Sequence, residues 1–198
     1  MGLAKNVCVY CGSGEGRDPA FAAGAEALGR AFAAAGVGLV YGGGGHGLMG
    51  RLALAQLAAG GRVTGVIPDF LRKLECPVNA SAQELIVVPD MHQRKQTMFE
   101  RADAFVALPG GIGTLEELVE QLTWSQLARH TKPIVLADIN GFWRPLLSLI
   151  AHMRQNGFIR PDLELHYLVA ERIGDVLPMI ETALERQSAP VTTVDPRL

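Results

Sequence analysis

Short runs of apolar residues alternate with longer amphipathic runs along almost the whole chain. The apolar runs have the length of β-strands and are nearly continuous in Val, Ile and Leu, which is typical of strands covered on both faces of a sheet. They predict strands at 6–11, 36–42, 62–68, 84–89, 103–109 and 132–138, and a weaker one at 165–170. The amphipathic runs predict helices at 18–36, 47–61, 90–102, 114–128, 141–158 and 175–187.

This strand–helix alternation predicts the fold class α/β, with a Rossmann-like, doubly wound parallel sheet flanked by helices. The chain has 198 residues, 48% of them hydrophobic, and no repeat or linker divides it. We therefore expect a single domain over residues 1–187, followed by a flexible, polar tail at 188–198. In such folds, ligands bind at the carboxyl ends of the strands, where the strand order reverses.

The charge and the cysteines narrow the classes of function. Eighteen basic and twenty acidic residues leave a formal charge of −2, which indicates neither a nucleic-acid nor a membrane partner. The sequence has no signal-peptide pattern and no apolar run of membrane-spanning length, and its three cysteines cannot pair evenly, so we expect a cytoplasmic protein. Cys8 and Cys11 form a CxxC, but Cys8 lies inside an expected strand. We interpret both as small buried side chains and expect no metal site.

The glycine-rich turn after the second expected strand has two interpretations. Gly42–Gly47 and Gly45–Gly50 each match G-x-G-x-x-G between a strand and a helix, so NAD binding is one alternative. The motif follows the second strand rather than the first, and Asp69 is the only acid near the end of the next strand, which weakens that interpretation. The other is that Gly44 and Gly45 help to form a cradle for a smaller ligand.

A second glycine-rich strand end lies at "LPGGIGTLEE". Gly110, Gly111 and Gly113 allow a ligand to approach the backbone, and the helix that follows directs its first N–H groups at the same place. Two such strand ends suit a nucleoside monophosphate, which needs a phosphate site and space for the sugar and base. Thr114 and Glu117 also fit a capping box. Our hypothesis is that Glu117 both caps this helix and catalyses.

The segment "PDMHQRK" supplies positive charge. Asp90 is the expected N-cap, and Arg94 and Lys95 fall in the first two turns, where they oppose the helix dipole. Because cations are mildly unfavourable there on structural grounds, their placement indicates a binding role. Arg94 shares a helix face with Met98, which we also predict to be a substrate-binding residue, whereas a solvated basic face remains the alternative for Lys95.

The segments "CGS", "GGGGHGLMG", "MHQRK" and "LPGGIGTLEELVEQLTWSQL" together closely resemble the Lonely Guy family of cytokinin-activating phosphoribohydrolases, over roughly residues 5–185. The resemblance implies hydrolysis of the N-glycosidic bond of an adenosine 5′-monophosphate, often N6-prenylated, by a homodimer without a cofactor. It implies that Arg94 and Glu117 are the catalytic pair. The substrate-binding positions that it implies are Glu75, Arg94, Lys95, Gly111, Ile112, Gly113, Thr114, Leu115, Glu116, Glu117 and Thr123.

Departures and alternatives remain. The family commonly has serines where this chain has Gly14 and Gly45, and a small or apolar residue in place of His46, so the choice of base stays open. Many members were once labelled lysine decarboxylases, but none of the four lysines lies in a recognisable pyridoxal-phosphate setting. The main alternative is a carrier of a phosphorylated ligand, such as the molybdenum-cofactor carriers of the same fold superfamily. A carboxylate beside the anion site favours the enzyme.

Overall fold

The computed structural model describes residues 4–75 and 83–188, and its centre is one seven-stranded sheet. The strand order is β4-β3-β2-β1-β5-β6-β7, and every pair of neighbours is parallel. The predicted doubly wound α/β fold is therefore confirmed. The strands are β1 (Asn6–Tyr10), β2 (Gly38–Tyr41), β3 (Val63–Pro68), β4 (Gln83–Val88), β5 (Ala104–Ala107), β6 (Ile134–Ala137) and β7 (Leu168–Ala170).

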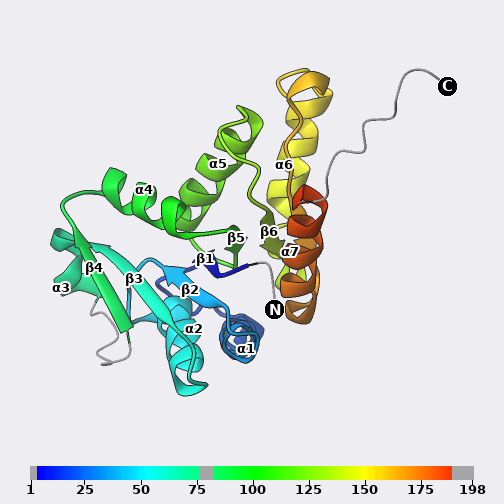
Figure 1. The fold of residues 1–198 in the computed structure, drawn as a ribbon. Coiled ribbons are helices and arrows are strands. Elements are labelled where there is room, and N and C mark those ends of the chain that lie inside the picture. The colour runs from blue at the N-terminus through cyan, green and yellow to red at the C-terminus, as the bar shows by residue number, and fades with distance from the viewer. Residues whose placement is uncertain (1–3, 76–82, 189–198) are drawn as a thin grey trace.

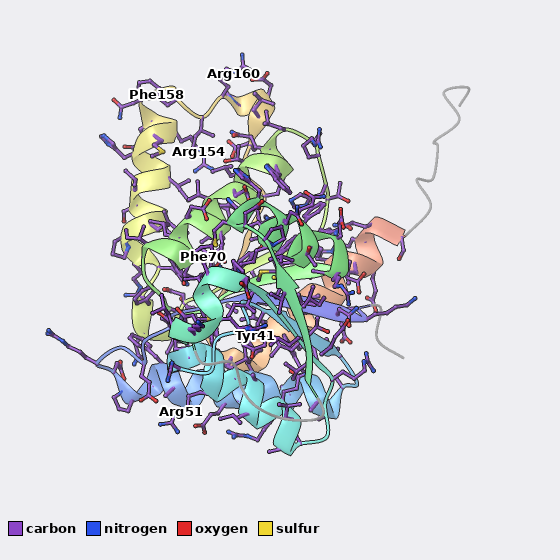
Figure 2. The ribbon with its side chains drawn as sticks, turned by 90° about the vertical axis from the view of Figure 1, so that its left-hand side faces the viewer. Tyr41, Arg51, Phe70, Arg154, Phe158 and Arg160 are labelled. Atoms are coloured by element: carbon purple, nitrogen blue, oxygen red, sulfur yellow. The ribbon has the colours of Figure 1, made fainter. Side chains whose placement is uncertain are left out.

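Helices cover both faces of this sheet (Figure 1). One face packs against α1 (Pro19–Ala34), α2 (Gly47–Ala58) and α7 (Ile173–Ser188). The other packs against α4 (Met91–Arg101), α5 (Ile112–Gln126) and α6 (Arg144–Gln155). The crossover from β3 to β4 contains the short helix α3 (Arg72–Glu75). Beyond the sheet, Arg154, Phe158 and Arg160 lie together at the tip of α6 and the turn that follows it (Figure 2).

The alternation of side chains along β1 explains why the strands are nearly continuous in apolar residues. Val7 and Val9 are buried against the α1, α2 and α7 layer. Cys8 and Tyr10 are buried against the α4, α5 and α6 layer. Since both faces of a central strand are covered, neither set of positions tolerates polar residues.

The strand order reverses at β1, which pairs with β2 on one side and with β5 on the other. Val7 is in register with Leu39 of β2 and with Ala104 of β5. The chain therefore leaves the carboxyl ends of β1 and β5 in opposite directions, which opens a crevice between the loops. Both glycine-rich turns and the start of α5 meet at this edge.

The structure corrects several boundaries. Only Leu168–Ala170 of the expected strand 165–170 is extended. The helix expected from 114 begins at Ile112, and the capping box that predicted its start does not form. Helix α7 continues to Ser188, so the first residue of the tail expected at 188–198 is helical, and residues 189–198 lie outside the described residues. None of the helices in the described parts of the chain has the length and apolar character needed to cross a membrane.

Cys8 and Cys11 are both free and buried, and they belong to opposite layers of the core. Burial raises the pKa of each thiol well above its ordinary range. Two thiols on opposite faces of a sheet cannot share a metal ion or form a disulfide without moving the strand.

Candidate active site

A cavity of about 270 Å³ lies at the carboxyl edge of the sheet, where the strand order reverses. It is bounded by the loop after β1, the end of β2, helix α3, the first turns of α4 and the start of α5. The predicted site residues that line it are Glu75, Arg94, Gly111, Ile112, Gly113, Thr114, Glu116 and Glu117. These come from three segments that are distant in the sequence: α3, α4 and the start of α5.

Arg94 is fixed in the wall of this cavity by acceptors on each of its nitrogens. Its Nε donates to the carbonyl of Val66 at 3.2 Å, and Nη2 donates to the carbonyl of Gly42 at 3.2 Å. Nη1 lies 3.2 Å from Oε1 of Glu117 and 3.9 Å from Sδ of Met91. With these partners, the guanidinium has little capacity left for a ligand, and it holds the carboxylate of Glu117 at the cavity wall.

Arg94 reaches this position because α4 begins where the sequence predicted. Oδ1 of Asp90 accepts from the N–H of Gln93 at 2.8 Å, as an N-cap does. This confirms the expected cap and places Arg94 in the second turn, facing the ends of β2 and β3.

Glu117 is buried, with 8% of its surface exposed. Burial raises the pKa of its carboxyl from an ordinary 4.5 to about 7, although the positive charge of Arg94 acts in the opposite direction. A carboxylate that titrates near neutral pH beside a cavity is typical of catalytic acid–base groups.

The capping-box prediction for Glu117 is wrong. Helix α5 begins at Ile112 with Gly111 as its N-cap, and no side chain caps it. Thr114 already lies within the first turn, so Glu117 falls in the second turn and its carboxylate pairs with Arg94 instead of reaching back. The ion pair between two helices replaces the local capping bond.

The amino terminus of α5 opens into the cavity. The N–H groups of Ile112, Gly113 and Thr114 have no hydrogen-bond acceptor among the residues that the structure describes, and all three residues line the cavity. A Cβ built on Gly111 or Gly113 meets nothing within 4 Å. Unsatisfied N–H groups at the positive end of a helix bind phosphate and other anions.

The amino terminus of α2, which the G-x-G-x-x-G pattern suggested as a dinucleotide site, differs in this respect. The N–H groups of Leu48 and Met49 both donate to the carbonyl of Gly12, at 3.0 and 3.3 Å. These N–H groups would have to bind a pyrophosphate, but a backbone carbonyl oxygen already accepts their hydrogen bonds. The NAD interpretation loses its main support.

Two glycines of the second turn leave room for side chains that line the cavity. A Cβ on Gly42 would lie 2.1 Å from Nη2 of Arg94, and one on Gly44 would lie 2.8 Å from Oε2 of Glu75. The N–H of Gly45 donates to the carbonyl of Glu75 at 2.8 Å. Gly44 and Gly45 therefore hold α3 beside the cavity, and they do not line it.

Four other predicted residues lie away from the cavity. Lys95 is paired with acidic side chains of α5. Met98 is fully buried in the core, where Leu115 also packs. Thr123 is exposed, and its hydroxyl donates to the carbonyl of Val119 at 2.8 Å.

Sequence reasoning missed an apolar part of the wall. Met49, Leu71 and Met91 line the cavity together with the start of α5. Met91 was detectable, since it lies three residues before Arg94 on the same face of the predicted helix. Met49 and Leu71 carried no such signal. Flexible thioethers and a leucine suit the flat face of a heterocyclic base.

Comparisons with known proteins show which chains this one is similar to. A family model described as "Possible lysine decarboxylase" matches residues 49–180. A cytokinin riboside 5′-monophosphate phosphoribohydrolase of Rhodococcoides fascians is 47% identical over 178 residues, covering 90% of each chain. A protein of the same name from Arabidopsis thaliana is 40% identical, covering 93% of this chain and 89% of its own. A molybdenum cofactor binding protein of Rippkaea orientalis shares the fold, with a TM-score of 0.67 at 22% identity over 92% of this chain and 99% of that chain.

Proposed function

Because the chain belongs to the Lonely Guy family of cytokinin riboside 5′-monophosphate phosphoribohydrolases, we propose that it hydrolyses adenosine 5′-monophosphate or its N6-prenylated form. Water adds to C1′ of the ribose, and the bond from C1′ to N9 breaks. The base leaves with the bonding electrons and takes up a proton, and the other product is ribose 5-phosphate. The observation that carries this proposal is the buried Arg94–Glu117 pair beside an open helix terminus.

The cavity matches the three parts of such a substrate. The phosphate is bound by the free N–H groups at the start of α5, from Ile112 to Thr114. The ribose then faces Glu117, one turn further along the same helix. The base extends toward Met49 and Met91, where the wall is apolar.

Glu117 supplies the chemistry. Departure of the base leaves positive charge near C1′, and a carboxylate about 4 Å away at an effective dielectric of about 20 stabilises it by roughly 4 kcal/mol. If this stabilisation exists only in the transition state, the rate rises on the order of a thousandfold. The same carboxylate can accept the proton of the attacking water, as in glycoside hydrolysis. Both roles require the ionised form.

Arg94 keeps Glu117 in place and favours its ionised form. Its guanidinium stays protonated, so it is a poor proton donor to the leaving base. Its nitrogens are occupied by Val66, Gly42 and Glu117, which leaves the phosphate to the backbone of α5.

The described lining of this cavity does not contain the lysine that a pyridoxal-phosphate decarboxylase needs. Pyridoxal-phosphate decarboxylases bind their cofactor through a Schiff-base lysine. Among the described residues that line the cavity there is no lysine. We therefore attach no decarboxylase activity to the description of the matching family model.

The test is to incubate the purified protein with AMP and with N6-isopentenyl-AMP and to follow the free base by chromatography and ribose 5-phosphate by a coupled assay. We expect both products in equal amounts. Comparable rates on the two substrates would indicate a general AMP nucleosidase, and a strong bias to the prenylated one would indicate cytokinin activation. Tight binding of the nucleotide without release of base would instead identify a carrier.

We propose that the protein acts as a cytoplasmic homodimer. Its odd number of cysteines and the free, buried thiols suit a reducing compartment. Large apolar side chains are exposed on the segments that border the cavity, which are α3 with the turn before it and α5: Phe70 (Figure 2), together with Leu74, Ile112 and Val119. A second copy that covers them would explain this exposure. Light scattering on a sizing column tests the proposal, and a monomer at micromolar concentration would overturn it.

A further inference from the structure

Lys95 forms two ion pairs across the seam between α4 and α5. Its Nζ lies 2.5 Å from Oε1 of Glu116 and 3.0 Å from Oε1 of Glu120. The Lys95 side chain is only 12% exposed, although the Glu116 side chain is 50% exposed. These two acids flank Glu117 on α5, so one ammonium group holds the helix turn that carries the candidate catalytic carboxylate.

The Lys95 side chain does not line the cavity in which we expect the substrate to bind. Arg94 lines the cavity and Lys95 does not, because successive residues of a helix point about 100° apart. The Lys95 ammonium group has three N–H donors. Two of its partners are already carboxylates, so at most one donor remains for a ligand. Lys95 is therefore poorly placed to bind the substrate phosphate, which the open start of α5 already accommodates.

We propose that Lys95 is a positioning residue, which clamps α5 to α4 through Glu116 and Glu120 and so sets where Glu117 meets Arg94. This inference rests on the proposed hydrolytic function. Arg94 and Lys95 are adjacent on α4, and Glu116 and Glu117 are adjacent on α5. A shift of one helix along the other therefore breaks both sets of pairs together.

The clamp also balances charge around Glu117. Arg94 and Lys95 face it from α4 and favour its ionised form, while Glu116 and Glu120 on its own helix oppose it. Cys8, Tyr10 and Cys11 approach from β1 and the loop after it, and burial keeps them neutral by raising their pKa values. Glu75 lines the same cavity from α3. Loss of Lys95 leaves Glu116 and Glu120 uncompensated, which raises the pKa of Glu117.

The test is the pH dependence of AMP hydrolysis in Lys95→Met. We expect the acid limb of kcat/KM to move up by about one pH unit, because a cation near a carboxylate shifts its pKa by about that much or more. At pH 6 this shift lowers kcat/KM about tenfold. We expect KM for AMP and the inhibition constant of ribose 5-phosphate to stay within about twofold, because Lys95 itself does not line the cavity. Lys95→Arg should restore the wild-type profile.

Two further variants test whether the shift in the pH profile comes from the charges around Glu117. Glu120→Gln removes an opposing charge, so its acid limb should move down, in the direction opposite to Lys95→Met. Lys5→Met removes one positive charge from an exposed position far from the seam and should leave the profile unchanged. Titration of the Glu117 carboxyl carbon by NMR, assigned with Glu117→Gln, gives the same pKa shift without any turnover.

The possible results distinguish a failure of the proposed function from a failure of the inference about Lys95. If wild-type protein releases no base from AMP, the proposed function fails, and the NMR titration still decides the role of Lys95. If Lys95→Met raises KM and weakens ribose 5-phosphate binding at least tenfold with an unmoved acid limb, Lys95 is a phosphate ligand and the inference is wrong. A Lys95→Met protein that matches wild type in the profile and the NMR titration also overturns it.

Discussion

Glu117→Gln separates the chemical role of Glu117 from its structural one. Glutamine has nearly the same shape and keeps an oxygen that accepts from Nη1 of Arg94, but it carries no charge. A carboxylate near C1′ contributes roughly 4 kcal/mol at an effective dielectric of about 20. We therefore expect kcat to fall at least about 100-fold and up to about a thousandfold.

The same substitution should stabilise the protein at alkaline pH. Burial raises the pKa of Glu117 from 4.5 to about 7, so the folded state holds this proton more tightly than the unfolded state does. The favourable contribution is complete below the unfolded pKa of 4.5 and is lost as pH rises through the folded value near 7. The difference corresponds to about 3 kcal/mol at pH 8. Glutamine, which stays neutral, avoids this loss.

The assay is thermal unfolding of both proteins at pH 5 and pH 8. With about 2–4 °C for each kcal/mol in a chain of this size, Glu117→Gln should raise Tm by roughly 6–12 °C at pH 8 and by little at pH 5. Glu185→Gln, at an exposed position, is the control and should show no such difference. A Glu117→Gln protein that is less stable than wild type at pH 8, or one that keeps full turnover, would refute this reasoning.

Three further substitutions test other contacts. Gly42→Ala places a Cβ 2.1 Å from Nη2 of Arg94, so turnover should fall about 100-fold, whereas Gly174→Ala, with open space around it, should not affect activity. Gly113→Ala puts a methyl group into the open phosphate site, and KM for AMP should rise about tenfold without a change in Tm. The amide of Gln121 is buried without a partner in the described residues, so Gln121→Leu should raise the free energy of unfolding, measured by urea, by about 1 kcal/mol.

The sequence predicted the fold well because each strand and helix follows from its own periodicity. The strands are continuous in apolar residues since helices cover both faces of the sheet, as Val7 and Cys8 illustrate on opposite sides of β1. The meeting of Arg94 and Glu117 also follows from the pattern, because each lies on a helix that begins at the carboxyl edge of the sheet.

What the sequence could not predict depends on contacts between distant segments. The capping box at Thr114 is a valid local signal, but the chain becomes helical earlier and Glu117 pairs with another helix. Gly42 looks like part of a nucleotide motif, yet it is a glycine because the guanidinium of Arg94 occupies the space of its side chain. Lys95 carries no sequence mark that distinguishes a ligand contact from a clamp.

The most direct test of the central claim is a crystal structure of Glu117→Gln with AMP bound. We predict that the phosphate accepts hydrogen bonds from the N–H groups of Ile112, Gly113 and Thr114, and that the side chain at position 117 faces C1′ of the ribose. A phosphate bound away from the start of α5, or a side chain at position 117 turned away from C1′, would contradict the account.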